Sequence, residues 1–78
     1  MTVTEELDTN TAQAARLADE LDDAIRQLER VIANLERGSN GARSGGYRSR
    51  LRVQIKAKDA ELAAMNRMRS NLRARFGV

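Results

Sequence analysis

The side chains with the most chemical potential in this sequence are cations grouped near its middle. Glycines and serines separate several of them, and the cluster comprises Arg43, Arg48, Arg50, Arg52 and Lys56. Guanidinium and ammonium groups bind anions, so a nucleic-acid phosphate backbone or an acidic protein surface would suit this cluster. The alternative is that these side chains pair with acidic residues of the same chain or are only solvated. Both interpretations stay open at this level.

Residue types that carry most enzyme chemistry are absent. The chain has no histidine, cysteine or tryptophan, which removes the commonest general base, the thiol nucleophile and the usual zinc ligands. The glycines around Arg43 lack the Gly-Lys-Ser/Thr ending of a phosphate-binding loop, and no predicted strand precedes them. We therefore expect no enzymatic activity, no cofactor, no metal ion and no small-molecule substrate.

Composition indicates long helices rather than a mixed core. The chain has 78 residues, of which 32% are charged and only 3% aromatic, and it contains no proline. A chain this short buries little of its own surface and usually needs a partner subunit for stability. No stretch reaches the length of a membrane span, and no signal peptide is recognisable. We expect a protein of the cytoplasm or of a macromolecular particle.

Heptad repeats predict two helices. The first helix is expected over residues 3–37, where apolar or small residues recur every seven positions in two rows. These rows are Thr4, Thr11, Ala18, Ile25, Ile32 and Leu7, Ala14, Leu21, Leu28, Leu35. A second helix is expected over residues 47–76, with rows Ile55, Leu62, Arg69, Phe76 and Leu51, Lys58, Met65, Leu72. A loop over residues 38–46 joins them, with Gly38 and Gly77 as predicted C-caps.

The two repeats can be aligned as an antiparallel hairpin centred on the loop. That alignment places Leu28 opposite Ile55, Leu21 opposite Leu62 and Ile32 opposite Leu51, with Leu7 opposite Phe76 at the far end. It also brings Arg48 to Leu35, Lys58 to Ile25 and Arg69 to Ala14, where basic residues would either extend toward water or fix the register. The predicted hairpin core is Leu7, Ala18, Leu21, Ile25, Leu28, Ile32, Leu35, Leu51, Ile55, Leu62, Met65, Leu72 and Phe76.

Further apolar residues lie outside this seam. A third row on the first helix, together with a small-residue face and a methionine on the second, exceeds what one partner helix can cover. These residues are Val3, Leu17, Ala24, Val31, Val53, Ala57, Ala60, Ala64 and Met68. They predict a homo-oligomer, most simply a dimer of coiled-coil hairpins that forms a four-helix bundle or part of a larger helical assembly.

Charge is divided unequally between the two halves. Residues 1–37 hold nine acidic and four basic side chains, whereas residues 38–78 hold two acidic and ten basic ones. The row Asp8, Asp22, Glu29 and Glu36 flanks the seam on the same side as Arg52 and Arg73, so part of the basic charge can be neutralised within the hairpin.

Two families of helical hairpins resemble this chain. The copy-control RNA-binding protein Rop is similar in size, heptad pattern and dimeric architecture, although none of its functional residues can be matched. The segment SNGARSGGYRSRL, residues 39–51, is similar to the turn of type III secretion needle subunits, although the prolines usual there are missing.

The sequence thus predicts an all-α, non-enzymatic structural or adaptor subunit that associates with itself and with other protein subunits, for example within a phage or secretion-type particle. The alternative is a small RNA- or DNA-binding hairpin dimer that uses the basic cluster.

Overall fold

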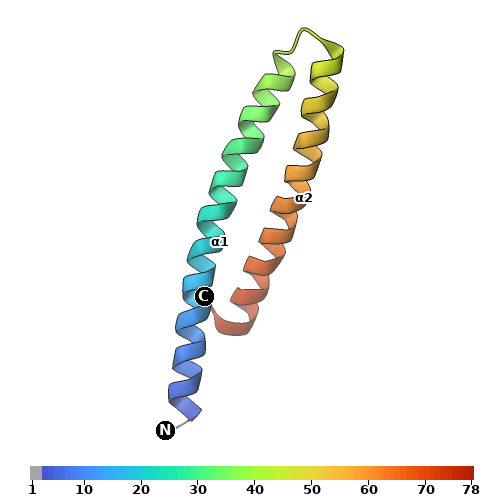
Figure 1. Ribbon diagram of the computed structural model, residues 1–78. Helices are drawn as coiled ribbons and strands as arrows, with labels where there is room; N and C mark the ends of the chain where they lie inside the picture. The colour runs from blue at the N-terminus through green and yellow to red at the C-terminus, as the bar shows by residue number, and fades with distance from the viewer. Residues whose placement is uncertain (1–2) are drawn as a thin grey trace.

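The computed structural model describes the backbone of residues 3–78 and the side chains of residues 9–78. Helix α1 spans Val3–Asn40 and helix α2 spans Gly45–Phe76; the two run antiparallel and pack against each other (Figure 1). Residues 3–78 contain no strand. The all-helical hairpin predicted from the heptad repeats is therefore confirmed. It is a slender rod that measures 64 × 14 × 14 Å over its Cα atoms.

The turn is shorter than the sequence predicted. Helix α1 continues three residues beyond the expected end at Arg37, and α2 begins two residues before Tyr47, so only residues 41–44 connect them. Ser44 is the N-cap of α2, because its Oγ accepts a hydrogen bond of 3.3 Å from the backbone N–H of Tyr47. The sequence analysis does not identify this cap, because it places Ser44 inside a glycine-rich loop.

Gly38 does not cap α1, and the prediction that it would is wrong. Gly77 is the only residue between 3 and 78 that has a positive φ, at 71°, and its N–H donates to the carbonyl of Arg73 over 2.8 Å, as predicted for the C-cap of α2. A Cβ atom at Gly38 would lie 3.4 Å from Cδ1 of Leu51. The small residue at position 38 thus allows α2 to approach closely rather than allowing α1 to end.

The predicted alignment of the two helices is also wrong, by one heptad. Leu51 lies against Gly38 instead of Ile32, Arg48 bonds to the carbonyl of Ala42 instead of facing Leu35, and Arg69 bonds to Asp22 instead of facing Ala14. These contacts are displaced along α1 by six, seven and eight positions.

A heptad repeat defines the alignment only to within a multiple of seven residues. The contacts next to the turn, Arg48 with Ala42 and Leu51 with Gly38, belong to the alignment observed. As a result, Phe76 lies beside Asn10, Gln13 and Ala14, and the first turns of α1 project beyond the end of α2 (Figure 1).

The core is a single seam, and most of its buried residues come from α1. Seven apolar residues are buried: Ala14, Ala18, Leu21, Leu28, Ile32, Ala42 and Leu51. The other core positions predicted within residues 9–78 are half-buried, namely Ile25, Leu35, Ile55, Leu62, Met65, Leu72 and Phe76. None of the described side chains is fully enclosed, because two helices alone cannot surround a residue.

Two of the predicted contact residues, Leu7 in the core and Val3 in the oligomer interface, lie outside the residues whose side chains are described. Within the described part of the chain, neither helix has an apolar stretch long enough to traverse a lipid bilayer.

Candidate interaction surfaces

The end of the hairpin that carries the turn is strongly basic. Between Arg37 and Lys58 the sequence contains seven cationic side chains and no acidic one. The five members of the predicted cluster, which we call the basic turn, are Arg43, Arg48, Arg50, Arg52 and Lys56, and all are exposed. They extend from the loop into the first three turns of α2, whose first turn has no acidic residue to offset them.

One member of the basic turn has a structural role. The NH2 group of Arg48 donates a hydrogen bond of 2.8 Å to the carbonyl oxygen of Ala42, which ties the start of α2 to the loop. Arg43, Arg50, Arg52 and Lys56 form neither a side-chain hydrogen bond nor an ion pair with any described residue. Their charges are therefore available to an external anion.

Neutralisation of Arg52 and Arg73 by the acidic row of α1 was expected, and the described residues do not form those pairs. Arg52 lines a shallow groove together with Glu36, Ser39 and Asn40, yet no ion pair joins Arg52 to Glu36. Two exposed ion pairs within residues 9–78 each join residues of the same helix, Arg26 with Asp23 in α1 and Lys58 with Glu61 in α2.

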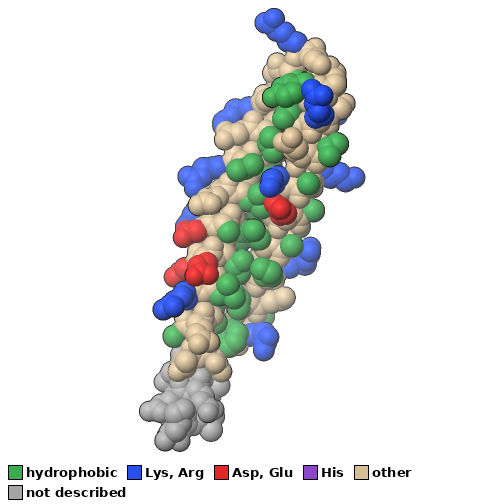
Figure 2. Space-filling model, in the orientation of Figure 1, with side chains coloured by type: hydrophobic (Ala, Val, Ile, Leu, Met, Phe, Trp, Pro, Cys, Tyr) green, Lys and Arg blue, Asp and Glu red, His purple; other side chains and the backbone are tan. Residues whose placement is uncertain are grey.

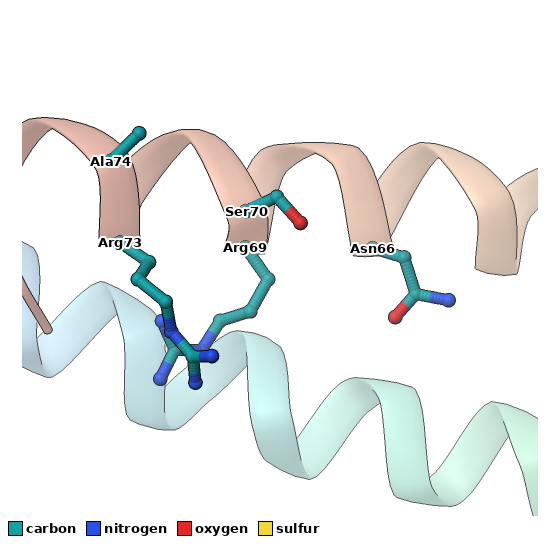
Figure 3. Close-up of a pocket in the computed structure, with 5 residues that line it drawn as sticks. All are labelled: Asn66, Arg69, Ser70, Arg73 and Ala74. Carbon is teal, nitrogen blue, oxygen red and sulfur yellow. The ribbon is translucent and has the colours of Figure 1, made fainter.

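Arg69 forms an ion pair between the two helices, on the side of the seam that carries the acidic row of α1. Its Nε donates to Oδ1 of Asp22 over 2.8 Å, and its side chain is only 19% exposed. Its NH1 atom is buried without a hydrogen-bond partner. Figure 3 shows Arg69 and Arg73 extending from α2 toward α1 in a groove also lined by Asn66, Ser70 and Ala74.

A second candidate surface is apolar and runs along the opposite flank of the seam. Leu17, Val31 and Met68 are 44%, 42% and 49% exposed, and Ala24 is half-buried between the first two on the same row of α1. We call these four residues the apolar strip. Leu17 and Met68 line one groove together with the core residues Leu21 and Leu72. Figure 2 shows hydrophobic side chains in a band between the helices on one face of the rod, with most cations at its edges.

The remaining predicted interface residues occupy a different face. Leu51 is buried against α1, and Val53 and Ala60 follow it by two and nine positions, which at 100° per residue turns them away from α1. Val53 is 70% exposed. Ala57 is exposed and Ala64 is half-buried beside this face. The predicted interface residues whose side chains are described thus lie on two surfaces, the apolar strip and the small-residue outer face of α2.

Ser39 and Ala42 are buried residues that the sequence analysis did not assign to the core. Each continues a heptad row of α1, seven positions after Ile32 and Leu35, so the pattern already contained them. They were missed because the loop was expected to begin at Gly38. The pairing of Asp22 with Arg69 could not be found in the same way, because it depends on which heptad alignment the helices adopt.

No family model, curated protein or solved structure matches this chain.

Proposed function

We propose that this protein is a non-enzymatic assembly subunit: a helical hairpin that pairs with a second copy of itself and presents the paired rod to other protein subunits. The observation that carries the proposal is the apolar strip, where Leu17, Val31 and Met68 remain nearly half exposed along one side of the seam. Burial of such residues against another chain removes apolar surface from water, which is favourable by about 25 cal/mol per Å².

The incomplete core supports the same proposal. Leu62, Met65 and Leu72 occupy seam positions and are nevertheless only half-buried, because α1 covers one side of each. A second hairpin placed over the apolar strip would cover the other side and produce a four-helix bundle. The available face is also large enough. At 32 residues, α2 is about 48 Å long, and two helices are about 20 Å wide. The product is about 960 Å², against about 800 Å² per partner in a standard interface.

Charge favours one orientation of the second copy. The half of the chain that contains α1 is acidic and the half that contains α2 is basic. A bundle in which α1 of each copy lies beside α2 of the other separates like charges. For antiparallel neighbours related by a two-fold axis, this arrangement places both turns at the same end of the bundle.

Sedimentation equilibrium tests the proposal. We expect the wild-type chain to sediment as a dimer through the micromolar range. The double variant Leu17→Ser/Met68→Ser should sediment as a monomer and retain its helical circular dichroism, because both residues are largely outside the core. A wild-type chain that remains a folded monomer up to millimolar concentration would refute self-association.

Val53→Ser is the matched control, since it removes apolar surface from the outer face of α2 and leaves the apolar strip intact. It should not change the mass. If Val53→Ser dissociates the dimer and Leu17→Ser/Met68→Ser does not, the outer face of α2 is the interface instead.

A further inference from the structure

We propose that the first three turns of α2 bind in the major groove of duplex DNA, with the outer face of the helix toward the base pairs and cations on both flanks toward the phosphates. This inference rests on the basic turn and on the outer face of α2. It does not depend on the assembly proposed above, because neither surface includes the apolar strip.

The arrangement of residues around α2 supports this orientation. Leu51 faces α1, and the side of the helix turned away from α1 carries the small residues Gly46, Ser49 and Val53. Small side chains let a helix backbone approach the floor of a groove closely. An α-helix is about 10–12 Å in diameter and the major groove of B-DNA is about 12 Å wide, so the sizes match. Val53 is 70% exposed and would meet a thymine methyl group wherever the groove presents one.

Charges flank this small-residue face on both sides. Counted around the helix from Leu51, Arg50 lies on one flank, whereas Arg52 and Lys56 lie on the other. A groove presents one phosphate backbone at each rim, so cations on both flanks can be neutralised at once. Arg43 adds a charge in the adjoining loop, next to the N-terminus of α2, which is the positive end of the helix dipole. The next acidic residue along the chain is Asp59.

Other polyanions fit this surface less well. The major groove of A-form RNA is too deep and narrow to admit a helix. Single strands require aromatic stacking platforms, and Tyr47 is the only aromatic residue in this region. Few side chains on the outer face can read base edges, so binding is independent of sequence and depends mainly on phosphate contacts. An acidic protein surface would engage the same cations, and the experiment distinguishes it from DNA by using poly-glutamate as a probe.

Fluorescence anisotropy with three probes tests the proposal: a labelled DNA duplex of mixed sequence, an RNA duplex of the same sequence, and poly-glutamate. We expect the DNA duplex to bind at least 10-fold more tightly than either of the others in about 50 mM salt, since only its groove admits the helix. With four phosphate contacts, the slope of log K against log salt should be about −3.6, so affinity falls about 100-fold between about 50 and 200 mM salt. Equal binding to RNA or poly-glutamate, or no binding to DNA in about 50 mM salt, would overturn the proposal.

Paired variants place the site. Arg50→Ala/Arg52→Ala should reduce the slope to about −1.8, whereas Arg16→Ala/Arg30→Ala, which removes two exposed charges from α1, should leave it near −3.6. Val53→Glu directs a carboxylate at the groove and should weaken binding about 10-fold or more, while Gln13→Glu adds the same charge on α1 and should have much less effect. Equal losses from the members of either pair would show that only the net charge matters and would contradict a site on α2.

Discussion

Arg69 and Asp22 form the one ion pair that joins α1 to α2 among residues 9–78, with Nε of Arg69 2.8 Å from Oδ1 of Asp22. The two residues come from different turns of a repetitive seam, and no other alignment of the heptads brings this carboxylate to this guanidinium. The pair therefore identifies the observed alignment, and it does so at a cost, because NH1 of Arg69 is buried without a partner.

Asp22→Asn should destabilise the hairpin by about 1 kcal/mol, since it leaves the guanidinium of Arg69 half-buried without a carboxylate. The effect is modest because the Asp22 side chain is 38% exposed and partly screened by water. Arg69→Met should be neutral or stabilising by about 1 kcal/mol, because an apolar side chain fills the seam and removes the buried donor. Urea unfolding of the two single variants and the double variant measures both. A larger loss from Arg69→Met than from Asp22→Asn would contradict this interpretation.

Gly38→Ala should stabilise the protein by up to about 1 kcal/mol. The residue lies inside α1, where alanine is the better helix former, and the new methyl group would meet only the flexible end of Leu51 at 3.4 Å. Gly77→Ala is the contrasting variant, and it should destabilise by about 1 kcal/mol because position 77 has φ of 71°. Thermal unfolding followed by circular dichroism compares them. If Gly38→Ala lowers the melting temperature, the added methyl group is not tolerated against Leu51, and the prediction is wrong.

Disulfide trapping distinguishes the two alignments, and the absence of native cysteine gives a clean background. Gly38→Cys/Leu51→Cys should oxidise readily, because a Cβ at position 38 lies beside the Leu51 side chain. Ile32→Cys/Leu51→Cys, which joins the pair expected from the sequence, should oxidise slowly, since the two positions are about 9 Å apart along the rod. Electrophoretic mobility under denaturing, non-reducing conditions reads out both variants. Faster disulfide formation in the second variant would support the alignment predicted from the sequence.

The orientation of the proposed dimer can be tested with single cysteines at the two ends of the hairpin. Arg43→Cys lies in the turn and Asn10→Cys lies near the far end, and both positions are exposed. If the turns share one end of the bundle, each variant should cross-link to its own copy with a short bis-maleimide. If the turns lie at opposite ends, cross-links should appear only when the two variants are mixed. Val53→Cys controls for collisions, because it lies on the outer face of α2.

The hairpin could be predicted from the sequence because leucine and isoleucine recur with a period that only a packed helix pair explains. Leu21, Leu28, Ile32 and Leu51 are all buried as a result. The helix ends were harder to predict. Gly38 has the residue type of a C-cap, yet Leu51 requires a small neighbour there, and a tertiary contact of this kind leaves no local trace.

The candidate surfaces show a similar division. The cluster of cations is evident in the sequence, but whether the acidic row of α1 neutralises it was left open there. In the structure Arg52 shares a groove with Glu36 and forms no ion pair with it. The separation of Val53 from Leu17 and Met68 depends on the angular position of each residue around its helix, which the helical periodicity of the sequence already indicates. The pairing of Arg69 with Asp22 required the alignment itself, which the heptads leave undetermined.

The alignment of the two helices has a consequence at the end of the molecule opposite the turn. Because the two helices are joined at one end, the heptad alignment between them decides how far α1 extends past Phe76 at the other end. A change of a few residues around Ser44 that favoured the neighbouring heptad would retract that protrusion by about 10 Å without altering either helix. Residues next to the turn can thus determine how far α1 extends past Phe76 at the opposite end of the rod.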